Sequence, residues 1–247
     1  MDKALFTAMT GAKHNMLAQA VRSNNMANVN TTGFRADFAQ ARSMPIYYGE
    51  GMPTRAFALT ESPSTDFSAG ALMSTGGELD VAIEGEGYFA LQAPDGSEVY
   101  SRDGNLTIDR DGILRNGSGL PVMGSGGLIS IPPSEKIEIA IDGNITSLIK
   151  GQGAESLALV DRLKLVNPDT ANLVKGADGY LRLRNGGETE FDTGIKVVSG
   201  FLEGSNVNVI NEFTEIMTLS RQYEMQVKMM KTVENNSESS AQLLRIS

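Results

Sequence analysis

The side chains in this sequence that could carry chemistry are few, and they form no complete set for any reaction. His14 is the only histidine and the chain has no cysteine, so a metal site of imidazole or thiolate ligands has no second member. Asp80, Glu84 and Glu86 could supply the two acids that glycoside hydrolysis needs. Alternation along a strand places all three on one face, however, and a solvated strand face has the same pattern. We therefore predict no catalytic residue and no metal site.

The glycines around Tyr88 carry no cofactor signal either. Gly85 and Gly87 form a Gly-x-Gly step that lacks the third glycine and the following helix of a dinucleotide fingerprint. This pattern predicts a turn or a bulge rather than a phosphate cradle. We expect no cofactor and no small-molecule substrate.

Composition narrows the class of protein. A chain of 247 residues with 40% hydrophobic content can bury a sizeable core and form one to three domains. Its net charge of -9 argues against a nucleic-acid partner, because such binding needs clustered Lys and Arg. No run approaches the roughly 20 apolar residues of a membrane-spanning helix.

The N-terminal residues lack the charged start and the continuous apolar run of a signal peptide. If the chain leaves the cytoplasm, we expect another export route. The absence of cysteine is compatible with an oxidising compartment.

Both ends of the chain have helical spacing. Residues 1–34 carry apolar side chains at Leu5, Met9, Ala12 and Met16, with Ala27 continuing the same face. Residues 205–247 predict one long helix, which Asn208 or Asn211 could cap. Its side chains follow the three- and four-residue steps of a coiled-coil seam. The seam positions are Phe213, Ile216, Ser220, Tyr223, Val227, Met230, Glu234, Ser237, Ala241 and Leu244.

Neither stripe has a partner within its own segment. We therefore expect the two ends to pair with each other and with neighbouring copies. The predicted subunit interface consists of Leu5, Met9, Ala12, Met16, Ala27, Phe213, Ile216, Tyr223, Val227, Met230 and Leu244.

The middle of the chain predicts β-structure. Residues 35–78 lack periodicity and contain three prolines, which indicates an extended connector with short strands. Residues 79–204 alternate apolar side chains between Asp-Gly and Asn-Gly dipeptides, which supply the positive φ of tight hairpin turns. We expect hairpin turns at the dipeptides Asp95-Gly96, Asp103-Gly104, Asp111-Gly112, Asn116-Gly117 and Asp142-Gly143. The predicted fold is mainly β with helical termini, around a central antiparallel β-domain.

Four motifs in chain order resemble a known family. They cover residues 24–35, 80–89, 100–105 and 203–208. This set is similar to the signatures of bacterial flagellar rod and hook proteins, the axial family. The residues that match the terminal signatures are Asn24, Asn25, Ala27, Asn28, Thr32, Gly33, Phe34, Asn206, Val207 and Asn208.

The resemblance implies a structural subunit without catalytic activity. Within the family, the short length fits a rod subunit, and the opening residues look most like the proximal type, with a distal rod subunit as the alternative. The implied partners are copies of the chain, other rod proteins and the flagellar type III export apparatus. The implied location is the basal-body rod within the periplasm, where helical stacking forms a drive shaft between the inner-membrane ring and the hook.

A different class of function also fits part of the pattern. A secreted β-rich module that binds carbohydrate could use helical termini to form oligomers. Such a module is expected to place aromatic side chains around a groove, yet the chain has no Trp and only 6% aromatic residues.

Overall fold

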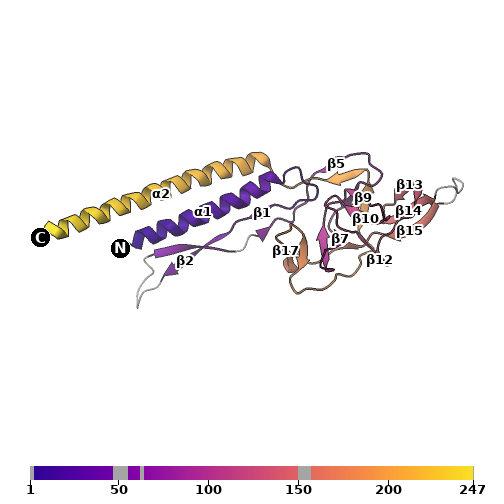
Figure 1. Ribbon diagram of the computed structural model, residues 1–247, viewed down its shortest axis with the longest axis horizontal. Coiled ribbons are helices and arrows are strands. Elements are labelled where there is room, and N and C mark those ends of the chain that lie inside the picture. Colours follow the sequence, from indigo (N-terminus) through magenta and orange to yellow (C-terminus); the bar gives the residue numbers. More distant parts are fainter. Residues whose placement is uncertain (1–2, 47–54, 62–63, 150–156, 247) are drawn as a thin grey trace. The chain divides into compact units, whose positions relative to one another are not determined.

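Two α-helices near the ends of the chain enclose, in sequence, a long series of short strands (Figure 1). The structure is a computed structural model that describes residues 3–46, 55–61, 64–149 and 157–246. The expected fold class, mainly β with helical termini, is confirmed. No helix among these residues is long and apolar enough to cross a membrane.

The chain divides into two compact units. The helical unit comprises Met1–Asn28, Ala36–Asp66 and Val207–Ser247, and the β unit comprises Val29–Arg35 and Phe67–Asn206. Each unit is described separately below.

The helical unit is built on α1, Lys3–Ala27, and α2, Val209–Ile246. The two helices pack against each other in opposite directions, because Arg22 pairs with Glu212 near one end and Gly11 lies against the Gln226 side chain farther along. The expectation that the ends of the chain pair is therefore confirmed. Asn208 caps α2, since its Oδ1 accepts hydrogen bonds from the backbone N of Ile210 and Asn211.

The rest of the helical unit is two antiparallel strand pairs. Strand β2, Ala41–Ile46, pairs with β3, Arg55–Thr60, and β3 packs against α1. Strand β1, Asp37–Phe38, pairs with β4, Ser64–Thr65. A lone two-stranded hairpin has little stability in water, so contact with α1 explains why this segment is ordered beyond what its sequence pattern predicts.

The β unit contains a five-stranded antiparallel sheet in the order β16-β7-β8-β18-β17. Its strands are β7 Tyr88–Gln92, β8 Glu98–Ser101, β16 Leu165–Val166, β17 Leu173–Lys175 and β18 Leu181–Leu183. A 3-10 turn, Thr170–Asn172, precedes β17.

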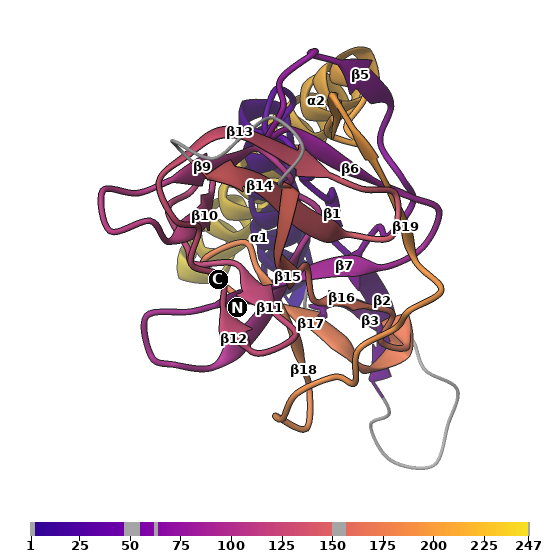
Figure 2. The same ribbon diagram turned by 90° about the vertical axis from the view of Figure 1, so that its right-hand side faces the viewer.

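A second sheet of the β unit has three strands, which lie side by side in Figure 2. They are β13 Ser134–Ile139, β14 Asn144–Ile149 and β15 Leu157–Arg162. Four two-stranded pairs complete the unit. They are β5 Leu72–Ser74 with β20 Phe201–Glu203, β6 Val81–Glu84 with β19 Lys196–Ser199, β9 Leu106–Ile108 with β10 Leu114–Asn116, and β11 Met123–Gly124 with β12 Gly127–Leu128.

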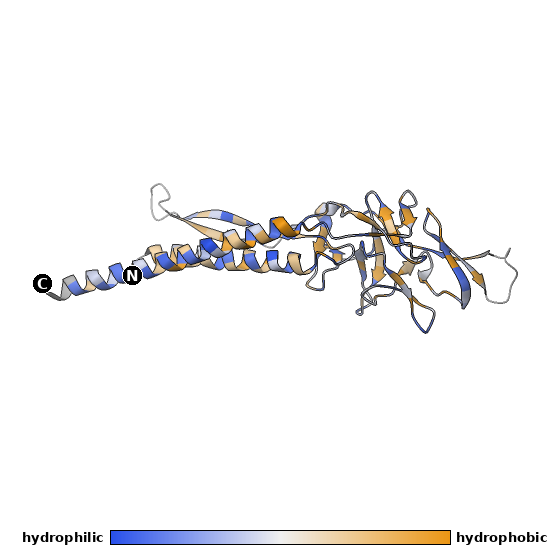
Figure 3. Cartoon of the chain, turned by 90° about the horizontal axis from the view of Figure 1, so that it is seen from above, coloured by the Kyte–Doolittle hydropathy of each residue, from blue (hydrophilic) through white to orange (hydrophobic). Residues whose placement is uncertain are grey.

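The main apolar core lies within the β unit, where Phe89, Leu91, Val99, Leu163 and Leu165 have no exposed surface. Figure 3 shows the same contrast in hydropathy, since apolar colour gathers on strands of this unit while both helices alternate between apolar and polar residues. Burial of such side chains contributes about 1.5 to 3 kcal/mol each. The helical unit buries mainly small side chains by comparison, such as Ala8, Ala12 and Ala18.

The predicted turn glycines divide into two groups. Gly96, Gly112 and Gly143 have positive φ, as expected. The prediction was wrong for Gly104 and Gly117, which do not. A Cβ on Gly104 would lie 1.7 Å from the carbonyl oxygen of Val81, so this glycine is required by a close backbone contact.

Asn116 does begin a turn, but the residue with positive φ comes later. Gly119 has a φ of 86°, and its backbone N donates to the carbonyl oxygen of Asn116. The side-chain oxygen of Asn116 accepts a hydrogen bond from the backbone N of Leu120. The turn is therefore longer than the two residues predicted, and Asn116 closes it with its side chain.

Candidate assembly surfaces

The contact between the two helices uses a narrow line of α2. Glu212 is buried, and the side chains that follow it on the same side of α2 are partly buried. They come at three- or four-residue steps, apart from one step of seven between Leu219 and Gln226. This line, the inner seam, consists of Glu212, Ile216, Leu219, Gln226, Met230 and Val233. It includes Ile216 and Met230 of the predicted interface. Their contacts within one copy are therefore with α1.

The facing side of α1 carries small side chains. Ala8, Ala12 and Ala18 are buried, and a Cβ on Gly11 would lie 2.7 Å from the Gln226 side chain. Small residues allow two helices to approach closely. Among the predicted interface residues on α1, Ala12 is thus buried within the copy and Leu5 is half-buried.

Other predicted interface residues face away from this contact. Met9 is 51% exposed, Met16 is 63% exposed and Phe213 is 55% exposed. Ala27 is exposed as well. Tyr223 and Val227 are 39% and 41% exposed but lie at the edge of the helix contact, since Val227 shares a pocket with Leu5 of α1 and with Met230. The side chain of Leu244 lies outside the described residues. The structure therefore places the predicted interface residues on two faces of the helix pair rather than on one.

The exposed side chains of α1 form a regular line. They recur at three- and four-residue steps, the spacing of a helix-packing seam. This outer stripe of α1 consists of Phe6, Met9, Lys13, Met16 and Ala20. A second group lies exposed on α2 and is rich in methionine: Ile210, Phe213, Met217, Met225 and Met229. Exposed apolar groups on this scale mark interaction surfaces.

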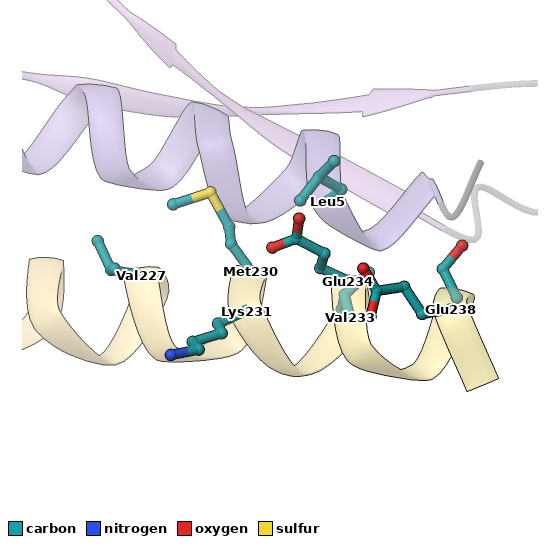
Figure 4. Close-up of a pocket in the computed structure, with 8 residues that line it drawn as sticks. Leu5, Val227, Met230, Lys231, Val233, Glu234 and Glu238 are labelled. Carbon is teal, nitrogen blue, oxygen red and sulfur yellow. The ribbon is translucent and has the colours of Figure 1, made fainter.

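A groove opens where α1 begins, and Figure 4 shows its walls. It encloses a cavity of about 650 Å³. Leu5, Val227, Met230 and Val233 supply its apolar lining. The polar residues around it are Lys231, Glu234, Ser237 and Glu238. We call this the end groove.

The signature segments of the β unit meet side by side. The backbone N of Gly33 donates to the carbonyl oxygen of Glu203 at 2.8 Å, and the N of Asn206 donates to the carbonyl oxygen of Phe34 at 3.4 Å. The Thr32 hydroxyl donates to Oδ1 of Asp103 at 2.5 Å. Gly33 has a φ of 66°, and a Cβ there would lie 2.4 Å from the backbone of Arg102. This explains why a glycine is needed.

Behind these segments lies a buried charge cluster that the search for site residues missed. Glu203 accepts from Arg102 at 2.9 Å and forms an ion pair with Arg35 at 2.7 Å, and all three side chains are at least 95% buried. Oε1 of Glu203 also accepts from the backbone N of Gly70. The sequence did contain a sign of this cluster, because all three charged residues lie inside the family motifs at 24–35, 100–105 and 203–208.

Two arginines share one carboxylate in this cluster. Burial lowers the pKa of Arg102, and the neighbouring Glu203 opposes that shift. Arg102 also donates to the carbonyl oxygens of Ile83 and Gly85, and its guanidinium lies 5.4 Å from the centre of the Tyr88 ring. The cluster therefore ties β6 and the turn after it to the two signature segments.

The asparagines of the signatures organise backbone. Asn25 is fully buried, and its side chain both donates to the carbonyl oxygen of Asp37 and accepts from the Asp37 N. The Asn28 side chain donates to the carbonyl oxygen of Asn24, and that of Asn206 donates to the carbonyl oxygen of Ser68. Val207, which follows, is half-buried. These contacts are structural and involve no reacting group.

The residues considered for chemistry are not assembled into a site. Oδ2 of Asp80 accepts from the Thr75 hydroxyl, and Glu84 and Glu86 are exposed. β6 ends at Glu84 and Gly85 has a φ of 86°, so the prediction that all three acids share a strand face was wrong for Glu86. Gly85 and Gly87 both have positive φ, which fits the predicted turn or bulge. His14 is half-buried on α1, and the described residues contain no group of three potential metal ligands.

Comparison with protein families gives three matches along the chain. Residues 5–35 match a family described as flagella basal body rod protein. Residues 82–147 match the flagellar hook protein FlgE/F/G D1 domain, and residues 198–243 match the flagellar basal body rod FlgEFG protein C-terminal region. The second match lies within the β unit, and the first and third cover most of α1 and α2.

Full-length relatives agree with these matches. The chain is 38% identical to the flagellar basal-body rod protein FlgF of Escherichia coli strain K12, over 100% of both chains. It is 32% identical to FlgF of Caulobacter vibrioides, over 99% of this chain and 98% of the relative. It is also 32% identical to the flagellar basal-body rod protein FlgG of Bacillus subtilis strain 168, over 94% of this chain and 95% of the relative.

Proposed function

This chain belongs to the family of flagellar basal-body rod proteins, and we propose that it forms the proximal part of the rod. Similarity over the whole length to relatives named as rod proteins is the observation that carries this proposal. The outer stripe of α1 and the exposed apolar side chains of α2 support it, because a polymerising subunit needs apolar surface that its own fold leaves uncovered. The subunit is structural, as its family is.

We assign two roles to the interface residues predicted from the sequence. Ala12, Ile216 and Met230 hold α1 and α2 together within one copy. This pairing leaves the outer stripe of α1 and the apolar side chains on the other sides of α2 exposed. Met9, Met16 and Phe213 then contact neighbouring subunits, as do Tyr223 and Val227. Burying one such side chain contributes about 1.5 to 3 kcal/mol, so several per contact offset the cost of ordering the helices.

The exposed methionines suit a helical array. Their unbranched side chains fill irregular gaps and adapt to slightly different neighbours. Met217, Met225 and Met229 on α2 therefore allow contacts with copies of this chain and with other rod proteins. A tube of packed helices resists twisting, which is how such a subunit passes torque from the inner-membrane ring to the hook.

The same proposal places the rod in the periplasm. We expect export through the flagellar type III apparatus, without a cleaved signal peptide. The absence of cysteine supports passage into an oxidising compartment, since no thiol is available for incorrect pairing.

Electron microscopy of basal bodies from a strain that lacks this gene tests the proposal, with the complemented strain as the control. We expect no rod above the inner ring in the deletion strain and a normal rod after complementation. A short stub of rod in the deletion strain would instead indicate a distal subunit, the type that similarity to FlgG relatives also allows. An intact rod and hook would remove the chain from the axial structure.

A further inference from the structure

We infer that the outer stripe of α1 in one copy docks on the acidic end of α2 in a second copy, with Lys13 facing Glu234 and Glu238 across the contact. This inference rests on the proposed self-assembly. It adds a defined partner face and a defined position along the helices.

The receiving surface is the end groove together with the part of α2 beyond it. Gly11 lies against Gln226, so Lys3 at the start of α1 lies opposite about residue 234 of the antiparallel α2. Residues 235–246 of α2 extend past that point, by about 18 Å at 1.5 Å per residue. We call this segment the overhang. Its inner side has no helix against it among the described residues.

The overhang continues the inner seam with small side chains. Ser237 and Ala241 follow Val233 at four-residue steps, on the side of α2 that α1 covers farther along. Small side chains there allow another helix to approach closely. In Figure 4, Leu5 and Met230 lie on the apolar side of the groove, with the carboxylate of Glu234 beside them.

Charge selects the incoming helix. The stretch 234–242 holds Glu234 and Glu238 and no Lys or Arg, and the one base of the overhang, Arg245, comes seven residues after Glu238. Helix α1 is the opposite, because Lys3–Ala27 contains no Asp or Glu at all. In its outer stripe, Lys13 stands between Met9 and Met16, and in the described residues no carboxylate pairs with it. A lysine in the middle of an apolar stripe fits a partner surface that is apolar with an acidic edge.

Length matches as well. The outer stripe runs from Phe6 to Ala20, about 21 Å along the helix axis. The overhang is of similar length, so one α1 stripe covers it. The exposed side of α2 nearer its start is a poorer partner, because Arg221 and Lys228 lie there beside Glu215 and Glu224.

Charge reversal tests the contact in motile cells. We expect Lys13→Glu and the pair Glu234→Lys with Glu238→Lys each to lower the number of completed rods by about fivefold or more. Because both partners belong to this chain, a triple variant that carries all three changes restores the attraction and the rods. Lys228→Glu is the matched control, since it reverses an exposed lysine of α2 that lies outside both the end groove and the overhang.

Covalent trapping gives an independent readout in the full chain, which has no cysteine of its own. Within one copy, Lys13 and Glu238 lie about 14 residues apart along the helix pair, roughly 21 Å. A disulfide needs Cα atoms closer than about 7 Å. A disulfide between Lys13→Cys and Glu238→Cys, introduced on two differently tagged copies, therefore forms only between copies. The control pairs Lys13→Cys with Met229→Cys.

The outcomes separate this inference from the proposed function. A disulfide at position 238 but not at 229, or rescue by the triple variant, supports the contact. A disulfide only at position 229, or motility unaffected by Lys13→Glu, overturns it while the rod assignment stands. If a cysteine variant stops rod formation, the charge-reversal series alone decides. An intact rod in the deletion strain refutes the proposed function itself.

Discussion

At the scale of single residues, Glu203 is the one carboxylate between two buried guanidinium groups, those of Arg35 and Arg102. Replacing it with Gln leaves both positive charges buried without a counter-charge. Breaking a buried pair in this way costs about 3 to 5 kcal/mol. We expect Glu203→Gln to lower the urea concentration at which half of the β unit is unfolded. Near-ultraviolet circular dichroism measures this midpoint.

The exposed Glu78→Gln is the control for that experiment, since it removes an acid from the same unit without emptying a buried pair. Equal midpoints for Glu203→Gln and the natural chain would show that water reaches the cluster and solvates both arginines.

Asp103 gives a prediction for pH. Burial raises the pKa of this carboxyl, although the hydrogen bond from Thr32 opposes the shift. A folded-state pKa above the unfolded value means that the folded state binds the proton more tightly than the unfolded state does. Protonation of this carboxyl at lower pH therefore stabilises the fold. The natural chain should therefore gain stability relative to Asp103→Asn as the pH is lowered from neutral through that pKa. Urea unfolding between pH 7 and pH 4 measures the difference.

The sign of this effect separates it from ordinary acid unfolding, in which the folded protein loses stability as its paired carboxylates take up protons. Asp111→Asn, at an exposed turn, should give a curve parallel to that of the natural chain. A difference between Asp103→Asn and the natural chain that stays constant with pH would contradict the prediction.

Residue roles were predictable from the sequence only in part. The single histidine and the absence of cysteine leave no imidazole or thiolate ligand set, which is why the sequence predicts no metal site. Gly104 was assigned to a turn because Asp-Gly is a turn dipeptide, whereas the glycine is needed for contact with Val81 from a distant part of the chain. Local pattern carries no information about which backbone will approach a given residue from elsewhere in the fold.

At the scale of elements, Ile216 lies in the inner seam between the helices. Placing a carboxylate there, in Ile216→Asp, opposes helix pairing, because a charge in an apolar contact is costly. We expect the β unit to stay folded, since its core is separate, and incorporation into the rod to be lost. Motility and basal-body microscopy measure incorporation.

The matched control is Ile216→Leu, which keeps the apolar volume and should leave motility normal. The near-ultraviolet signal of the β unit checks that Ile216→Asp has not unfolded the whole chain. Normal motility of Ile216→Asp would count against any role of the inner seam in assembly.

The helices also show where prediction from periodicity ends. Spacing correctly located both helices, and of the two caps that the sequence offered for α2, Asn208 and Asn211, the structure uses Asn208. It did not identify which line of α2 faces α1, because apolar side chains such as Met217 and Met225 occupy several sides of that helix. The observed line follows the small residues of α1, and a partner's small side chains cannot be found from the pattern of α2 alone.

At the scale of the whole molecule, folding and assembly are expected to be coupled. The helical unit has little large apolar core of its own and exposes much apolar surface, whereas the β unit has a closed core. Fixing each residue costs about 1 to 2 kcal/mol in backbone entropy. We predict that helix content rises with protein concentration, because neighbouring copies supply the missing contacts.

Far-ultraviolet circular dichroism across a concentration series, paired with sedimentation, measures this coupling. Lys13→Glu, which weakens the inferred contact between copies, should shift the rise to higher concentration. Constant helix content in samples that do assemble would show that the helix pair is fully formed before contact.

One backbone contact in the β unit has a consequence for how such proteins diversify. The hydrogen bond from Gly33 to Glu203 brings together the two places where the polypeptide enters and leaves most of that unit. The segment between Gly33 and Glu203 is therefore an insert, a cassette, whose two ends are held at a constant separation. Such a cassette can be lengthened, shortened or exchanged without altering the sequences on either side. We therefore expect that insertion of a reporter domain at an exposed turn within it, such as Gly186-Gly187, leaves the conformation of the two terminal segments unchanged.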